Sequence, residues 1–141
     1  MKYILTIFTL LFLTTSIQSK EIVIEMLNKR DDGERMVYSE DLAKIDVGDT
    51  IKWVPTDGNH NVDWVGGPDG VTLPDRSKMS KEVSITFDNP GIYVYICTPH
   101  SIMGMIGVVV VGGDTSNKDA MAKIKIGGKG TRKLKALLDT L

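Results

Sequence analysis

The sequence has very little of the residues that stabilise or activate many small proteins, with one cysteine and two histidines in 141 residues. A single cysteine, Cys97, excludes an internal disulfide framework. Basic residues are not interleaved with aromatic ones in any patch, which argues against nucleic-acid binding. No apolar run reaches the ~20 residues of a membrane-spanning helix. The chain must therefore be stabilised by a hydrophobic core, and its one thiol needs a specific role.

The N-terminal residues have the pattern of a secretory leader. Lys2 precedes a short apolar run over residues 4–13, and mostly small or polar residues follow up to Ser19. Such a sequence is typical of a signal peptide, here residues 1–19. An uncleaved membrane anchor is the alternative, and the short run disfavours it. We therefore expect export to the periplasm, cleavage near Ser19 and no membrane contact afterwards, although Ile17 is a poor match three residues before the cut.

Charge is nearly balanced over the whole chain, at a net −1, but it is unevenly distributed. Residues 20–113 hold nine Lys or Arg and fifteen Asp or Glu, whereas residues 114–141 hold seven and three. A basic tail on an acidic body can steer a partner. A solvated helix face is the more frequent cause of such a pattern.

Residues 20–113 indicate a series of short strands. Alternation in residues 21–27 places Ile22, Ile24 and Met26 on one face, which is the pattern of a half-buried strand. Glycine and proline are frequent between residues 63 and 80, so we expect a loop there. Strand patterns recur at residues 36–38, 44–47, 50–54, 82–87, 92–96 and 106–111. Many short strands separated by turns predict a mainly β fold, a sandwich or barrel.

Residues 114–141 change to a helical period. Ala120, Met121 and Ile124 predict a first helix that ends at residues 127–128. A second helix is expected from near Thr131. Its apolar face consists of Leu134, Leu137, Leu138 and Leu141. We expect this face to pack on the sandwich within the same domain, although a partner-binding or membrane-surface helix has the same pattern.

The only cysteine lies in a turn that also carries a histidine and two methionines. Cys97, His100 and Met105 fall within one short segment, and the second histidine, His60, lies in a polar loop after a strand pattern. Thiolate, imidazole and thioether are ligands that suit copper, with the thioether as a weak axial ligand. These four residues form the trigonal-plus-axial set of a blue-copper electron-transfer centre. Met103 competes with Met105 for the axial position.

Three other functions use similar residues. A catalytic pair of Cys97 and His100 would need an open thiolate and an orienting third group, and Met105 would have no role in it. A structural zinc site is disfavoured because zinc rarely takes a thioether ligand. A copper storage or delivery protein is the main alternative to an electron carrier. Because the four ligands leave no position for a substrate, we expect electron transfer and not enzymatic catalysis.

Six segments together match one known family. They are residues 26–29, 47–50, 55–57, 60–62, 97–100 and 103–105. The chain resembles the cupredoxins, and among these the pseudoazurin family most closely. The resemblance implies a Greek-key cupredoxin β-sandwich over residues 20–113, two C-terminal α-helices in residues 114–141 and one type 1 copper ion. It places the axial ligand at Met105 and leaves Met103 on the surface.

The resemblance also implies roles around the copper. The backbone N–H of Asn61 is expected to reach the Cys97 sulfur and to tie the two ligand loops together. Pro99 has no N–H and cannot offer the sulfur a second such bond. His100 is expected to be the port for electrons, at an apolar surface patch. The candidates for this patch are Met36, Pro55, Pro99, Ile102 and Met103.

By resemblance, the chain is expected to be a monomer that passes electrons between periplasmic redox proteins, with copper nitrite reductase or a c-type cytochrome as a partner. In the family, a ring of lysines surrounds the apolar patch. Here Ile96 stands where relatives often have lysine, and the ring candidates that remain are Lys29, Lys78 and Lys81. Rim charges chiefly set association rate and partner choice, so this departure affects the partner more than the electron-transfer role.

Overall fold

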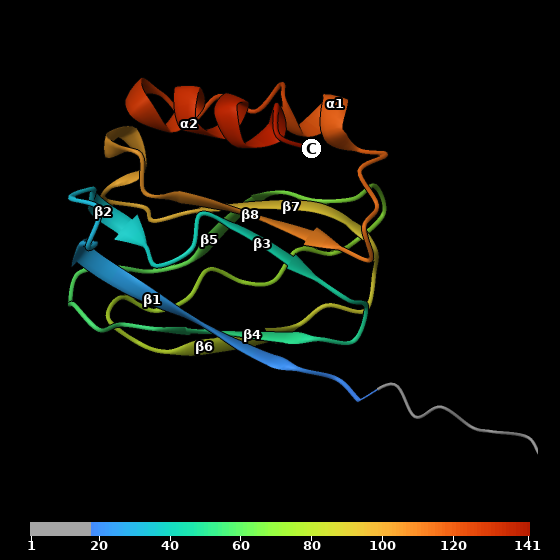
Figure 1. Ribbon diagram of the computed structural model, residues 1–141, viewed down its shortest axis with the longest axis horizontal. Helices are drawn as coiled ribbons and strands as arrows, with labels where there is room; N and C mark the ends of the chain where they lie inside the picture. Colours follow the sequence, from blue (N-terminus) through green and yellow to red (C-terminus); the bar gives the residue numbers. More distant parts are fainter. Residues whose placement is uncertain (1–17) are drawn as a thin grey trace, which may run out of the picture.

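The computed structural model describes residues 18–141, so the predicted signal peptide lies almost entirely outside the described residues. Within them the chain forms strands, one short 3₁₀ turn and two helices (Figure 1). The strands are β1 (Glu21–Lys29), β2 (Arg35–Tyr38), β3 (Leu42–Ile45), β4 (Thr50–Val54), β5 (Asp63–Gly66), β6 (Val83–Thr86), β7 (Gly91–Ile96) and β8 (Ile106–Val111). The remaining elements are η1 (Ser101–Met103), α1 (Lys118–Met121) and α2 (Gly128–Leu138).

The strands form two four-stranded sheets that face each other. One sheet has the order β2-β1-β4-β6 and the other has the order β3-β8-β7-β5. Two neighbouring pairs are parallel, β1 with β4 and β3 with β8, and the other pairs are antiparallel. Neighbours that are distant in sequence require connections that cross between the sheets, as in Greek-key sandwiches. The predicted mainly β sandwich with two C-terminal helices is confirmed.

Aromatic residues fill the space between the sheets. The rings of Tyr38 and Tyr95 lie 4.8 Å apart, and the ring of Trp53 lies 5.2 Å from that of Tyr95, both edge to face. This arrangement is the one that aromatic quadrupoles favour. Cys97 and Met105 belong to the same buried cluster. The hydrophobic core therefore extends without a break to the end of the sandwich that carries the ligand loop.

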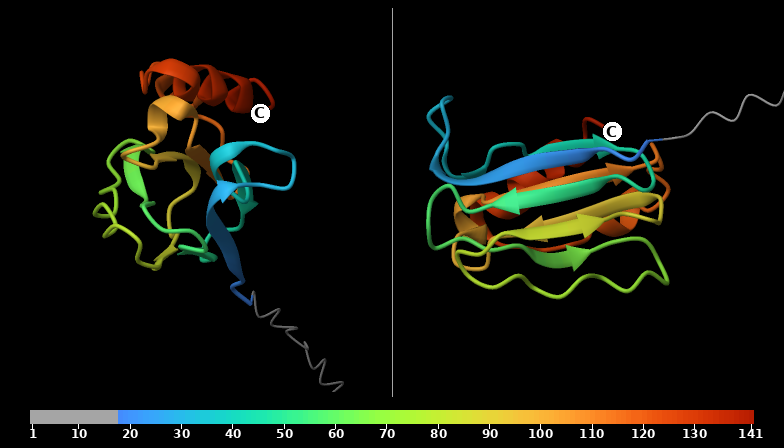
Figure 2. Two further views of the ribbon diagram at one scale, coloured as in Figure 1. Left: turned by 90° about the vertical axis from the view of Figure 1, so that its left-hand side faces the viewer. Right: turned by 90° about the horizontal axis from the view of Figure 1, so that it is seen from below.

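The two helices cover the outer face of the sheet that contains β7 and β8 (Figures 1 and 2). Leu134 and Leu138 are buried in a second apolar cluster with Ile92, Val94 and Val108. The apolar stripe of α2 thus packs on the sandwich. None of the helices within residues 18–141 has the length and apolar character needed to cross a bilayer.

The helix boundaries differ from those predicted. Helix α1 ends at Met121, and α2 begins at Gly128, before the predicted start at Thr131. The early start of α2 follows from the glycine pair at 127–128, where φ is 97° and 52°. These left-handed conformations turn the chain into α2. The Thr131 hydroxyl accepts the backbone N–H groups of Ile126 and Gly127, so it holds the turn before the helix.

The prediction of a loop throughout residues 63–80 was wrong at its start, because β5 lies there. Only four residues long, β5 pairs with β7 and buries Trp64 in the core. Gly66, which indicated a loop, is buried, and a Cβ at this position would lie 2.4 Å from Ile124 Cδ1. Glycine is needed here for close packing of the tail on the sheet and not for a turn.

The basic tail is bound to the acidic body by ion pairs. Lys129 of α2 pairs with Glu34, and Lys133 lies 2.5 Å from Asp41, which also accepts Arg30 at 3.1 Å. These contacts join α2 to the segments around β2. Two of the seven basic residues in 114–141 therefore serve the docking of the helix on the sandwich.

The packing of Gly107 gives a test of the core. Gly107 on β8 pairs with Tyr95 on β7, and a Cβ at Gly107 would lie 2.2 Å from Tyr95 Cζ. We expect Gly107→Ala to lower the free energy of unfolding by about 1–3 kcal/mol, because the buried ring has no space to move. Urea denaturation would measure this loss. The control is Gly58→Ala, where the nearest atom is Ser80 Oγ at 3.7 Å and a change within about 0.5 kcal/mol is expected. Equal losses in the two variants would contradict the packing argument.

Candidate copper site

The ligand loop is held at both ends by the pairing of β7 with β8. Ile96 and Ile106 are the last paired residues, and the Cys97 N–H donates to the Met105 carbonyl at 2.9 Å. Inside the loop, the Met105 N–H donates to the His100 carbonyl at 3.2 Å. Gly104 has a φ of 103°, which a residue with a side chain rarely adopts, and this ends the 3₁₀ turn. These backbone hydrogen bonds and the turn at Gly104 thereby fix the positions of Cys97, His100 and Met105.

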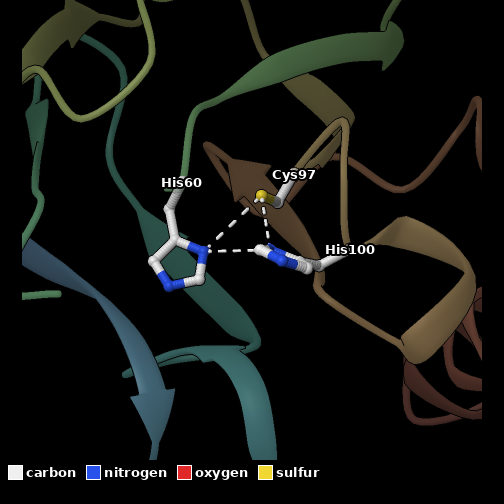
Figure 3. A group of neighbouring side chains, drawn as sticks. All are labelled: His60, Cys97 and His100. Carbon is white, nitrogen blue, oxygen red and sulfur yellow. Dashed lines mark hydrogen bonds between the residues drawn. The ribbon is translucent and has the colours of Figure 1, made fainter. Parts of the chain in front are cut away.

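Three donor atoms from two loops converge at this end of the sandwich (Figure 3). Cys97 Sγ lies 3.7 Å from His60 Nδ1 and 3.5 Å from His100 Nδ1, and the two Nδ1 atoms are 3.2 Å apart. Nitrogen and sulfur donors about 2.0–2.3 Å from one metal ion, at trigonal angles, lie about 3.6–3.8 Å apart. The triangle has nearly the size needed to hold a metal ion, and its soft donor set suits copper.

The hydrogen bond of His60 fixes which nitrogen faces the site. His60 Nε2 lies 3.0 Å from Asn28 Oδ1, and this amide oxygen can only accept. Nε2 therefore carries the proton, and Nδ1 presents its lone pair to the other donors. Burial lowers the pKa of both histidines, and for His60 the nearby His100 lowers it further. Both imidazoles are thus favoured in the neutral form that binds metal.

The thiol of Cys97 experiences opposing effects. Burial raises its pKa, whereas hydrogen bonds from the backbone N–H groups of Asn61 and His100 lower it. The family resemblance implies this role for Asn61, which stays a prediction. Pro99 offers no N–H, and the second backbone group that favours the thiolate belongs to the next residue, His100. Without a metal the thiol keeps its proton at neutral pH, and a bound cation would supply the missing stabilisation of the thiolate.

The two candidate axial methionines differ in exposure. Met105 is 0% exposed and lies in the same core cluster as Cys97, whereas Met103 is 47% exposed beside Ile102, which is 62% exposed. Met105 thus shares the buried surroundings of Cys97, and Met103 does not. The burial favours Met105 as the fourth ligand and Met103 as a surface residue.

The side chain of Asn61 adds a connection that the sequence did not reveal. Its Oδ1 accepts the Thr98 N–H at 2.8 Å, and its Nδ2 donates to Thr98 Oγ1 at 2.9 Å. The Asn61 carbonyl also accepts the Tyr38 hydroxyl at 2.7 Å. The side chain of Asn61 therefore joins the two ligand loops, and the core anchors this junction.

Helix α2 supports the ligand loop from outside. A Cβ at Gly130 would lie 2.4 Å from the Ser101 carbonyl oxygen, and one at Gly128 would lie 2.6 Å from that of Ile102. Backbone meets backbone here with no space between. The three glycines in residues 127–130 are the sequence signal for this approach, although sequence analysis used only the first two, as a helix end.

Comparisons with known proteins agree with this arrangement. Residues 24–112 match the model of copper-binding proteins of the plastocyanin/azurin family. The pseudoazurin of Paracoccus pantotrophus is 38% identical over 117 residues, which are 82% of this chain and 79% of that protein. The chain belongs to the pseudoazurins.

Solved structures of pseudoazurins have the same fold. The native protein from Hyphomicrobium denitrificans is 37% identical, with a TM-score of 0.79 over 86% of this chain and 98% of that one. The protein from Methylobacterium extorquens AM1 is 35% identical, with a TM-score of 0.75 over 85% and 98%. Pseudoazurins are electron-transfer proteins and not enzymes, and cupredoxins bind one type 1 copper. The predictions of copper as cofactor and of a blue-copper electron carrier are confirmed at this level.

The pKa directions predict how copper binding depends on pH. Above about pH 6.5 both histidines are neutral, whereas the thiol is protonated, so binding releases one proton. The affinity for Cu(I) should therefore rise about tenfold per pH unit between roughly pH 6.5 and 8. Competition with a Cu(I) chelator of known pH response would measure it. Cys97→Ser should lose this slope, and a flat profile for the native protein would contradict the assignment of the thiolate.

Proposed function

We propose that this chain is a periplasmic electron carrier that shuttles single electrons between redox proteins through copper held by His60, Cys97, His100 and Met105. The observation that carries the proposal is the closed donor set. His60, Cys97 and Met105 are each 0% exposed, and the three trigonal donors already face one another. A storage or delivery protein would have to exchange its metal readily, and such burial opposes exchange. The carrier is therefore favoured over that alternative.

The protein contributes a rigid site with a single outlet. Copper, when bound, supplies one-electron chemistry between Cu(II) and Cu(I). The ligand loop is fixed by the register of β7 and β8, and the second loop is tied to it by Asn61, so the donors have little freedom to move. His100 is partly exposed whereas His60 is buried. His100 is thus the ligand through which an electron can reach the surface.

The apolar docking patch is proposed to surround His100. Ile102 and Met103 are exposed on η1, and Pro99 is exposed in the same loop. Met36 and Pro55 are half-buried, with Met36 packed against the core. Exposed apolar residues next to a site are typical of interaction surfaces.

The partner is proposed from the family alone. Copper nitrite reductase is the acceptor expected from the resemblance, and a c-type cytochrome is the other candidate. Lys29, Lys78 and Lys81 are exposed, and they could supply a reduced ring of positive charge. Their number is expected to affect the association rate and its salt dependence more than electron transfer within the complex.

The visible spectrum tests the proposed site. The exported protein loaded with Cu(II) should show an intense band at about 600 nm, from charge transfer between thiolate and copper. The band should bleach with ascorbate and return on reoxidation. Cys97→Ser should lose the band while retaining the β-type far-ultraviolet circular dichroism. A weakly absorbing native complex, or a band that survives in Cys97→Ser, would refute the proposal.

The axial ligand is tested by a matched pair of variants. Met105→Gln should keep copper and lower the reduction potential by at least ~60 mV, a tenfold change in relative affinity for the two oxidation states, because an amide oxygen favours Cu(II) over Cu(I). Met103→Gln should leave the potential almost unchanged. Protein-film voltammetry would measure both. The opposite result would exchange the roles of the two methionines.

A further inference from the structure

A buried carboxylate lies at the end of the sandwich where β1 begins. Asp49 is 3% exposed, at the turn before β4. Its Oδ1 accepts the backbone N–H of Lys20 at 2.7 Å, and its Oδ2 accepts that of Asp46 at 3.0 Å. Among residues 18–141, no lysine or arginine nitrogen lies within 4.0 Å of it. Two backbone N–H groups therefore stabilise this carboxylate, and no ion pair within the described residues adds to them.

Lys20 is the first residue that the sandwich holds. Its carbonyl accepts the Thr50 N–H at 2.9 Å, while its own N–H binds Asp49. Gln18 and Ser19 are exposed and lie outside any strand. The chain leaves the sandwich at this point (Figure 1). The bond between Ser19 and Lys20 is therefore the boundary between free and bound backbone.

We infer that the chain is processed between Ser19 and Lys20, and that the new α-ammonium group of Lys20 forms an ion pair with the buried Asp49 carboxylate. A signal peptidase adds water across this peptide bond. Ser19 keeps the carboxylate, and the Lys20 nitrogen gains protons and a positive charge. The hydrogen bond already present, which the ionised Asp49 carboxylate accepts, then joins two opposite charges.

Neighbouring cut positions do not have this result. A cut before Ser19 leaves the Lys20 nitrogen as a neutral amide. A cut after Lys20 removes both the donor to Asp49 and the acceptor of the Thr50 N–H. Only the cut between them places a positive charge against the buried carboxylate.

The other charged groups around this pair are few. The side chains of Lys20 and Lys44, together with Asp46, line the same shallow hollow as Asp49. The hydrogen bonds from Lys20 and Asp46 lower the pKa of Asp49, and the charge of Lys20 acts in the same direction. Asp49 therefore stays ionised at neutral pH and can pair with the new cation.

The first test is the start of the exported protein. The full chain with its leader would be expressed in a Gram-negative host, and the periplasmic product would be analysed by intact mass and N-terminal sequencing. Lys20 is the expected first residue. Another first residue refutes this inference alone, whereas an uncut chain also refutes the export part of the proposed function, on which the inference rests. The copper spectrum is a separate test and does not depend on either result.

The second test concerns the ion pair. One alanine inserted between Ser19 and Lys20, with the start at that alanine verified by mass, turns the Lys20 nitrogen back into an amide. We expect the midpoint of thermal unfolding at pH 6 to fall by about 3–6 °C. The same insertion in an Asp49→Asn background should cause no further fall. An equal fall in both backgrounds, or none in the native background, refutes the pair.

A measurement on the unmodified protein covers the case in which Asp49→Asn does not fold. The Lys20 α-amino group can be titrated by NMR in the processed chain. Its pKa should lie above the ordinary range of about 7.7–8.0, because the carboxylate favours the charged form. A pKa within or below that range refutes the pair.

Discussion

The antiparallel pairing of β7 with β8 is the constraint on which the metal site depends. The register pairs Ile96 with Ile106, so Cys97 and Met105 are the next residues into the loop on either side. A backbone hydrogen bond of 2.9 Å from the Cys97 N–H to the Met105 carbonyl joins them. A ligand on a free loop would lose conformational entropy on binding a metal. Here the sheet has already fixed that segment during folding. The same aromatic core that stabilises the sheets therefore also fixes the positions of the donors.

Burial by that core acts differently on each ligand. It lowers the pKa of both histidines, which favours neutral imidazoles, and it raises the pKa of the Cys97 thiol, which disfavours the thiolate. Two backbone N–H groups, from Asn61 and His100, compensate only part of the second effect. The two imidazoles are thus already in the neutral form that binds metal, whereas the sulfur needs a bound cation to lose its proton. This asymmetry makes the thiolate the part of the site that depends most on the metal.

The sequence predicted what depends on short-range pattern. Local residue pattern correctly located most strands, including β7, which ends just before Cys97, and β8, which begins directly after Met105. It missed β5, because Gly66 serves close packing against the tail and its local pattern is that of a loop. It also missed the contact of Asn28 with His60, since the two residues are far apart in sequence and meet only through the pairing of strands. Contacts of this kind orient the ligands, but no short sequence motif predicts them.

The distribution of charge limits where a redox partner can be attracted. Residues 114–141 carry most of the excess positive charge, but Lys133 lies 2.5 Å from Asp41, and Lys129 pairs with Glu34. These pairs bring opposite charges together at the junction of helix and sandwich, so their fields largely cancel at a distance. Among the described residues, no ion pair involves Lys118, Lys123, Lys125 or Arg132, so the tail keeps part of its positive charge. Electron transfer needs close apolar contact, while encounter needs only a field. In the proposed docking mode, the exposed residues of η1 and the lysine ring would therefore serve separate steps. A change of partner during evolution could therefore alter the lysines and leave the copper ligands and the packing around them unchanged.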